Sequence, residues 1–361
     1  MIGNSSWKSV RLGDHCSKIG SGATPRGGKE AYQIFGISLI RSQNVHNWGF
    51  SEDGLAHIDE EQAKRLANVT VSEGDVLLNI TGDSVARVCQ VPNHILPARV
   101  NQHVAIIRPD NEKIDAGFLR YYLVSPAKQS SMLSIASGGA TRNAITKSMI
   151  EDFEMPCPSI EVQRAIASKL SVIDNLIVNN AKRIKILEET TQLIYREWFV
   201  YYRFPNHEKV KMVDSGTELG GVPEGWSCKR IGDVLEIKYG KTLPTSELLS
   251  DGEYPVYGAG DVIGRYDDFI VEQPTALITC RGNGSGTVWR TREKAFVTNN
   301  SLMLRGLPDF SDWNFTFIEY NLKHTNIRSA IGGAAQPQIT IASLESVPIL
   351  VPPNELVRQF V

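Results

Sequence analysis

The chain contains one long internal repeat, and this duplication limits its possible folds more than any other feature of the sequence. Residues 7–25 (WKSVRLGDHCSKIGSGATP) and 226–244 (WSCKRIGDVLEIKYGKTLP) share, in order, a Trp, a Gly-Asp pair, a second Gly and a Thr close to the final Pro. Residues 138–164 and 332–358 align without a gap and share Gly-Gly-Ala, Ile-Thr and the spacing Pro-x-x-Glu-x-x-Arg. Solenoid units are far shorter, at about 20–50 residues. The pattern therefore predicts two copies of one domain.

The middle parts of the two copies differ. Residues 26–98 and 245–297 share a pattern of short strands but few identities. A common frame with unlike middle parts indicates one scaffold that carries two different recognition surfaces. We expect an α+β fold, with two repeated recognition domains joined by a long coiled-coil helix. The expected elements are strands at 75–80, 86–91 and 103–107 with a helical stretch at 116–135, and strands at 275–280, 286–290 and 300–305 with a helical stretch at 312–330.

Residues 161–200 contain neither Pro nor Gly and are predicted to form one helix, roughly 60 Å long. Along it, spacings of four and three alternate, which is the pattern of a coiled-coil seam. The seam consists of Ile166, Leu170, Ile173, Ile177, Asn180, Ile184, Leu187, Thr191, Ile194 and Trp198. Asn180 either fixes the register of the pairing or is merely tolerated there. The length and regular spacing favour a coiled coil over a helix buried within one domain.

Domain boundaries follow from the repeat and the helix. We expect a first recognition domain at 1–158, a spacer helix at 159–203, a connector at 204–225, a second recognition domain at 226–354 and the start of another spacer helix at 355–361. The seam then lacks an intrachain partner. Either the chain is truncated or another polypeptide donates a helix, so we expect self-association or pairing with a second chain.

Composition excludes several classes of protein. No apolar run reaches the roughly 18 residues of a membrane span, and the N-terminus lacks the layout of a signal peptide. The five cysteines lie far apart, which favours reduced thiols and the cytoplasm. The histidines show no metal-ligand spacing with one another or with cysteine, so no metal is expected. The formal net charge is −2, so any DNA binding would need positive charge that is focused locally or supplied by a partner.

Sequence signatures of catalysis are missing. Pro352-Pro353 follows Val351, whereas methyltransferases of adenine N6 or cytosine N4 need an acidic or amide residue there. Gly240-Lys241-Thr242 resembles the end of a phosphate-binding loop, but Leu235 stands where that motif needs Gly. The Gly-rich run RGNGSG is more typical of a tight turn between strands than of a dinucleotide site. The sequence therefore indicates a non-catalytic protein that binds no cofactor of its own.

Taken in order, these motifs resemble the specificity subunits of type I restriction–modification systems. The resemblance rests on the Trp-x-x-x-x-(Leu/Ile)-Gly-Asp openings at Trp7 and Trp226, the Ile-Thr and Glu-x-x-Arg endings, the seam helix and the direct repeat, and it covers essentially the whole chain. It implies that each domain reads one half of a bipartite DNA site and that the length of paired antiparallel helices sets the spacing. It also implies a modification subunit that methylates adenine N6 with S-adenosylmethionine, and a restriction subunit that uses ATP, with magnesium also expected on these partners.

Residues that could read DNA are those whose side chains match base-edge donors and acceptors: Arg for guanine, and Asn or Gln for adenine. In the first domain the candidates are Thr24, Arg26, Arg41, Gln43, Asn44, Arg87 and Arg142. In the second they are Lys241, Thr242, Tyr257, Arg281, Asn283, Arg290 and Gln336, the last in the place of Arg142. Asn101-Gln102 and Asn299-Asn300 recur in both copies and are interpreted as parts of the shared frame.

Two other classes of function remain open from the residues alone. One is a coiled-coil scaffold whose globular heads bind proteins, which the near-neutral charge favours. Steep salt dependence of DNA affinity would argue against it. The other is a self-sufficient nuclease or methyltransferase, which lacks a catalytic signature.

Overall fold

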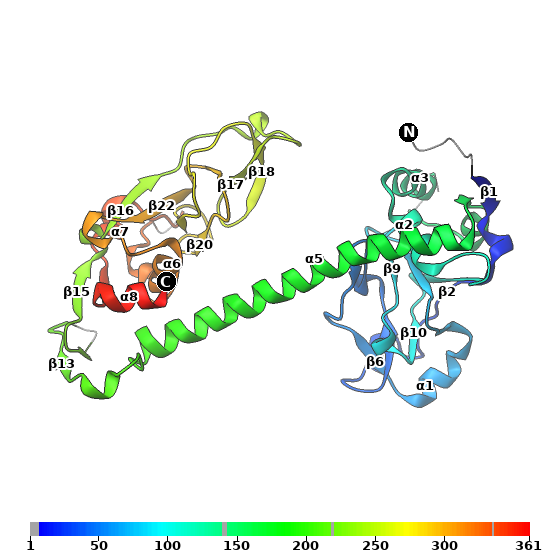
Figure 1. The fold of residues 1–361 in the computed structure, drawn as a ribbon, viewed down its shortest axis with the longest axis horizontal. Coiled ribbons are helices and arrows are strands. Elements are labelled where there is room, and N and C mark those ends of the chain that lie inside the picture. The colour runs from blue at the N-terminus through cyan, green and yellow to red at the C-terminus, as the bar shows by residue number, and fades with distance from the viewer. Residues whose placement is uncertain (1–6, 139–142, 218–219, 334–335) are drawn as a thin grey trace. The chain divides into compact units, whose positions relative to one another are not determined.

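The computed structural model describes residues 7–138, 143–217, 220–333 and 336–361 (Figure 1). The chain divides into two compact units, Met1–Lys182 and Arg183–Val361. The division falls inside the long helix α5 (Ile160–Tyr195). Of the helices in the described ranges, none combines the length and apolar character that a bilayer-spanning segment requires.

The first unit contains two four-stranded sheets with an apolar core on either side of the first. That sheet has the order β2 (Cys16–Ser21), β11 (Val104–Pro109), β8 (Val76–Asn79), β9 (Val88–Gln90). The second sheet has the order β6 (Ala56–Ile58), β3 (Ile37–Ile40), β10 (Ala98–Val100), β7 (Thr70–Val71). All four residues of β8 are buried, because Val76 and Leu78 face one core and Leu77 faces the other.

The remaining elements of the first unit cover these sheets or close its ends. The helices are α1 (Glu60–Arg65), α2 (Ala116–Val124), α3 (Pro126–Ser137) and α4 (Lys147–Glu151). Short antiparallel pairs join β1 (Lys8–Arg11) to β12 (Glu154–Cys157) and β4 (Val45–His46) to β5 (Gly49–Phe50). Residues of α2, α3 and α4 contribute to the same core as Val76 and Leu78.

The second unit repeats the main sheet in the same order: β16 (Leu235–Tyr239), β22 (Ser301–Gly306), β19 (Ala276–Thr279), β20 (Val288–Arg290). Beside it lies a three-stranded sheet of β18 (Val262–Tyr266), β17 (Tyr254–Tyr257) and β21 (Phe296–Val297). The helices are α6 (Phe315–Lys323), α7 (Ile341–Glu345) and α8 (Asn354–Phe360), and β15 (Ser227–Arg230) pairs with β23 (Pro348–Val351). The expected mixed fold with two repeated domains is confirmed.

The structure explains why the repeated motifs recur. A Cβ on Gly13 would lie 3.0 Å from the Cβ of Glu151, and a Cβ on Gly232 would lie 3.0 Å from that of Glu345. The Gly-Asp openings therefore allow the start of each copy to approach α4 or α7 closely. The Ile-Thr endings supply the helix caps, since Thr146 and Thr340 accept hydrogen bonds from the third residue of α4 and α7.

Two sequence expectations need correction. The helical stretch at 116–135 is two helices, because Pro126 cannot donate the backbone hydrogen bond that would continue α2. The stretch at 312–330 is regular only over α6, and a separate turn of 3₁₀ helix follows at Ile327–Ala330. Within the predicted connector, β13 (Met212–Asp214) and β14 (Gly221–Pro223) form an antiparallel pair.

An aromatic cluster marks the end of α5. The helix passes through one π-helical turn at Arg196–Val200. The Phe199 ring centroid lies 5.1 Å from that of Phe317 in α6 and 5.3 Å from that of Phe360 in α8. Trp226 packs on Phe199 as well, at 5.9 Å. The opening Trp of the second copy is therefore buried, at 7% exposure, whereas Trp7 is 45% exposed.

Candidate nucleic-acid interface

Polar side chains from three loops meet at one end of the main sheet in the first unit, where its strands lead into loops. Thr24 follows β2, Thr81 follows β8, and Gln102 and His103 precede β11. The Thr24 hydroxyl donates to Gln102 Oε1 at 2.6 Å, Gln102 Nε2 lies 3.0 Å from His103 Nε2, and His103 Nδ1 lies 2.6 Å from the Thr81 hydroxyl. These side chains form one hydrogen-bonded network.

The second unit builds the same arrangement with other side chains. The amide of Gly22 donates to the carbonyl of Val104 at 2.8 Å, and the amide of Gly240 donates to that of Ser301 at 3.1 Å. This register makes Asn299, not Asn300, the counterpart of Gln102. Asn299 Nδ2 donates to the Thr242 hydroxyl at 3.1 Å, in the place of the Thr24–Gln102 bond.

Both glycines at this end of the sheet are required by close backbone approach. A Cβ on Gly22 or on Gly240 would lie 2.2 Å from a carbonyl oxygen of the facing turn. Such a separation is impossible for a carbon and an oxygen that are not bonded to each other, so any side chain would displace the loop that presents Thr24 or Thr242. The shared Gly is thus a requirement of the frame, while its neighbours are free to differ.

The loop between β8 and β9 in the first unit and the loop between β19 and β20 in the second have the same backbone conformation but different side chains. Gly82 has φ 78° and Gly282 has φ 81°, and a second left-handed residue follows at Ala86 (φ 69°) and Gly286 (φ 89°). The amide of Gly82 donates to the carbonyl of Asn143 at 3.4 Å, and that of Gly282 donates to the carbonyl of Pro337 at 3.1 Å. With the backbone fixed, each side chain of one loop has a counterpart in the other: Thr81 and Arg281, Asp83 and Asn283, Arg87 and Thr287.

We call these two sets of residues the loop surfaces. Their members are half-buried or exposed and combine donors with acceptors of the kinds that match base edges. The first loop surface consists of Thr24, Thr81, Asp83, Arg87, Gln102 and His103. The second consists of Lys241, Thr242, Arg281, Asn283, Thr287 and Asn299.

Three candidates of the first unit are bonded to a neighbouring loop instead. Asn44 is fully buried; its Oδ1 accepts from the Arg41 amide at 3.0 Å and its Nδ2 donates to the Ser51 carbonyl at 2.9 Å. Arg41 donates to the Gly54 carbonyl, and Gln43 donates to the carbonyls of Asp53 and Gly54. These side chains close the loop at 44–54. Arg26 is exposed, with its backbone held by Gln62.

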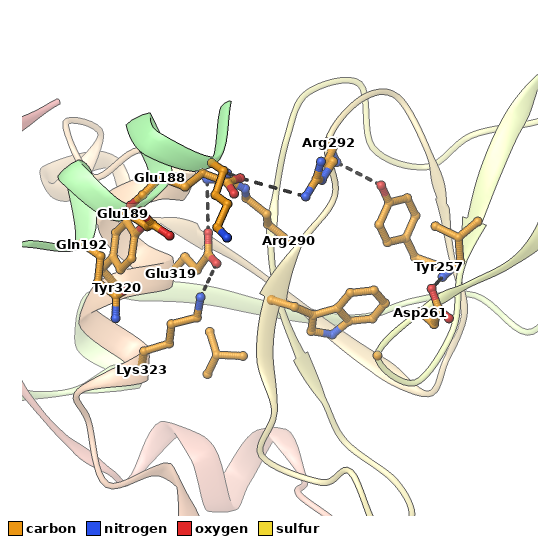
Figure 2. Close-up of a pocket in the computed structure, with 15 residues that line it drawn as sticks. Glu188, Glu189, Gln192, Tyr257, Asp261, Arg290, Arg292, Glu319, Tyr320 and Lys323 are labelled. Atoms are coloured by element: carbon orange, nitrogen blue, oxygen red, sulfur yellow. Dashed lines mark hydrogen bonds and ion pairs between the residues drawn. The ribbon is translucent and has the colours of Figure 1, made fainter. Parts of the chain in front are cut away.

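Two candidates of the second unit, Tyr257 and Arg290, line a pocket that contains none of the loop-surface residues (Figure 2). Tyr257 is 5% exposed; its hydroxyl accepts from the Arg292 amide at 3.1 Å and its ring packs on Trp289. Arg290 is held in ion pairs with Glu188 and Glu319. Gln336 is exposed beside the 281–287 loop, and Arg142 lies outside the described residues.

The seam residues divide into two groups. At the ends, Ile166 packs against the core of the first unit and Trp198 against that of the second. Between them the apolar seam residues are exposed, from 40% to 64%: Leu170, Ile173, Ile177, Ile184, Leu187 and Ile194. Asn180 is exposed too, and the Thr191 hydroxyl donates to the Leu187 carbonyl at 2.8 Å.

The loop surfaces also contain residues that were not among the candidates predicted from the sequence: Thr81, Asp83, Gln102, His103, Thr287 and Asn299. Gln102 and Asn299 were assigned to the frame because they recur, yet only their neighbour Asn101 is buried, with its Oδ1 accepting from the His103 amide at 3.2 Å. The position between two frame residues, directly after a buried strand, was the available signal. Within the described ranges, no cluster of three or more His, Cys, Asp or Glu could hold a metal ion.

Comparison with known proteins agrees with this arrangement. The family model described as "Type I restriction modification DNA specificity domain" matches residues 4–189 and 223–357, one match for each copy. The type I restriction enzyme MjaIX specificity subunit of Methanocaldococcus jannaschii is 24% identical, with 98% of this chain and 85% of that protein covered. The putative MjaX specificity subunit of the same organism is 23% identical, with 97% and 84% covered.

A solved structure shows the same fold. The S subunit of a type I restriction–modification system from M. genitalium superposes with a TM-score of 0.63 at 17% identity, covering 100% of this chain and 89% of that one. Together with the family match over both copies, these findings show that the chain belongs to the family of type I restriction–modification DNA specificity domains.

Proposed function

We propose that this chain is the sequence-reading subunit of a type I restriction–modification complex and that each unit reads one half of a bipartite DNA target through its loop surface. The observation that carries the proposal is the pair of loops at 81–87 and 281–287, which hold unlike side chains on matching backbones. Two readers built on one frame are what an asymmetric, two-part target requires. A scaffold that binds proteins has no need of this correspondence.

Direct readout follows from the chemistry of the side chains. Arg281 and Arg87 can each donate two hydrogen bonds to guanine, and Asn283 can pair with adenine. Gln102, fixed by Thr24 and His103, is suited to adenine as well. The exposed Lys241 and Arg26 fit phosphate contacts, which position the protein without reading bases.

The partners and cofactors of the proposal follow from the family. We propose a modification subunit that methylates adenine N6 with S-adenosylmethionine and a restriction subunit that consumes ATP with magnesium, in the cytoplasm, while this chain binds no cofactor. Because this chain is nearly neutral, with a net charge of −2, the partners would supply many of the phosphate contacts.

The exposed seam is proposed as the face that pairs with a second helix. Its six exposed apolar residues repeat at heptad spacing, and water contact along such a stripe is unfavourable. Within the second unit, the last residue of α8 packs against the end of α5, with the Phe360 ring centroid 5.8 Å from that of Tyr195. Light scattering at micromolar concentration tests whether a second copy supplies the partner helix: dimers are expected, and a strict monomer would exclude self-association.

Mapping of methylated adenines tests the proposed function. Cells that produce this chain with its modification subunit should methylate one bipartite motif with a single spacer length, and cells without the chain should not. A contiguous motif, or methylation that does not depend on the chain, would contradict the proposal.

A further inference from the structure

The first unit holds α5 through a partly buried ion pair as well as through its apolar core. Arg120 in α2 donates to Asp174 in α5 at 2.6 Å, with the Arg side chain 12% exposed and the Asp 35% exposed. The Tyr121 hydroxyl donates to the same carboxylate oxygen at 2.9 Å, and the Arg120 guanidinium lies 4.6 Å from the Tyr121 ring centroid. Burial, then the bond to Asp174, raises the pKa of Tyr121, so its hydroxyl remains a donor at neutral pH.

The second unit holds α5 through a different set of charges (Figure 2). Arg290 in β20 lies between Glu188 in α5, at 2.9 Å, and Glu319 in α6, at 3.2 Å. Lys323 pairs with the other oxygen of Glu319 at 2.6 Å. The Tyr320 hydroxyl donates to the backbone carbonyl of Glu188 at 3.2 Å.

The two sets occupy corresponding positions. Asp115 and Asn314 cap α2 and α6 by accepting from Phe118 and Phe317, so Tyr121 corresponds to Tyr320 and Arg120 to Glu319. This helix position thus carries a cation in the first unit, where Arg120 pairs with α5 directly, and an anion in the second, where Glu319 contacts α5 only through Arg290. Val76 pairs with Gln90 and Ala276 with Arg290, so the bridging Arg290 stands where the first unit has a neutral Gln. The exchange of charge on the helix is matched by a compensating change on the strand.

Each ionic contact lies at a distance from the apolar attachment of the same unit. Ala167 is in the core of the first unit, seven residues before Asp174, and Tyr195 is in the core of the second, seven residues after Glu188. Seven residues of α-helix span about 10 Å. An apolar contact alone allows a helix to roll and tilt, whereas a second, directional contact 10 Å away, as estimated from the helical rise, fixes its direction relative to the head.

We propose that two sets of positioning residues determine how strictly the protein measures the spacing between half-sites. They are Arg120, Tyr121 and Asp174 in the first unit, and Arg290, Glu319 and Glu188 in the second. The inference rests on the proposed function. Arg290 then serves specificity without touching DNA, by holding its unit at a fixed direction on α5.

Methylation of a random-sequence plasmid library by the full chain with its modification subunit tests this role. The variants are Arg120→Ala, Arg290→Ala and the exchanged pair Arg120→Asp with Asp174→Arg. The control is Arg65→Ala, which removes a surface pair with Glu61 in α1 that does not involve α5. In Arg120→Ala and Arg290→Ala the half-site sequences should stay the same, while methylation at spacers one base pair longer or shorter should rise about tenfold relative to the wild type. The exchanged pair should restore the single spacer, and the control should leave it unchanged.

The outcomes separate this inference from the proposed function. A bipartite wild-type motif whose spacing stays strict in both alanine variants would overturn the inference and leave the proposed function intact, whereas the absence of any bipartite motif from the wild type would overturn both. If the alanine variants methylate nothing, the exchanged pair decides: restored, strictly spaced methylation supports the positioning role, and inactivity in a chain that unfolds like the wild type overturns it.

Discussion

The two loop surfaces differ in almost every side chain and in almost nothing else. The 81–87 and 281–287 loops have left-handed residues at the same two positions. Each also donates one backbone hydrogen bond to a corresponding residue, Asn143 in the first unit and Pro337 in the second. Thr81, Asp83 and Arg87 stand against Arg281, Asn283 and Thr287. The comparison teaches that the frame is encoded by glycines, caps and buried strands, whereas recognition is encoded by the exposed positions between them.

The largest effect is expected in the core that both copies share. Phe118→Ala and Phe317→Ala each remove a buried ring at the same place in the frame, at 6% and 0% exposure. Each should lower the free energy of unfolding of its own unit by about 3–5 kcal/mol. Guanidinium denaturation followed by hydrogen exchange assigns the loss to a unit. A loss confined to one variant would break the equivalence of the two frames.

A smaller effect is expected on DNA binding from the arginines of the loops. Arg281→Ala should weaken binding by about 1–3 kcal/mol and relax the preference at one position of one half-site. Arg87→Ala should do the same in the other half-site. Titration with duplexes changed in one half at a time measures both, with Lys64→Ala in α1 as the surface control. Equal losses on every duplex would mean phosphate contacts instead of base reading.

The left-handed positions sharpen the comparison within the frame. Gly286→Ala should cost about 1–2 kcal/mol of unfolding free energy, because a side chain is unfavourable at φ 89°. Ala86→Gly should change it little, since relief at φ 69° offsets the loss of a fully buried methyl group worth about 0.8 kcal/mol. Thermal unfolding measures both. A large stabilisation by Ala86→Gly would show that the first loop is strained.

The smallest effect concerns a buried thiol in the first unit. Burial raises the pKa of Cys89 to about 12. In the unfolded chain a thiol loses its proton near pH 8.5, so the folded state binds more protons above that pH and stability falls as pH rises. The slope of this contribution is at most about 1.4 kcal/mol per pH unit between the two pKa values. Between pH 8 and pH 9 the contribution amounts to less than about 1 kcal/mol. Cys89→Val should remove it, as denaturation at these two pH values will show.

The frame was accessible from the sequence because its residues carry local signals. Strands β8 and β19 each begin with three consecutive apolar residues. Thr146 and Thr340 are residues of a type that commonly caps the start of a helix, here α4 and α7. Because the chain contains two copies of the domain, each strand pattern occurs twice, and the strand positions could be predicted closely. Pro126 is a sequence signal for the separation of α2 from α3, but the prediction treated 116–135 as one helical stretch.

The loop surfaces were only partly accessible, because contacts between distant segments decide which polar residues are exposed. Asn44 and Gln102 both carry amide side chains, yet Asn44 is buried and donates to the Ser51 carbonyl, whereas Gln102 is exposed and bonds with Thr24 and His103. Arg290 lies in a strand, and the partners of its side chain are Glu188, 102 residues earlier, and Glu319. No spacing rule within a single segment distinguishes these cases.

The most direct test of the account transfers three exposed side chains of the 281–287 loop onto the 81–87 loop. The triple variant Thr81→Arg, Asp83→Asn and Arg87→Thr gives the first unit the loop side chains of the second. Methylated adenines are then mapped in cells that also produce the modification subunit. The account predicts a changed sequence in one half-site, with the other half-site and the spacing unchanged. A motif that stays the same in both halves, or changes in both, would contradict it.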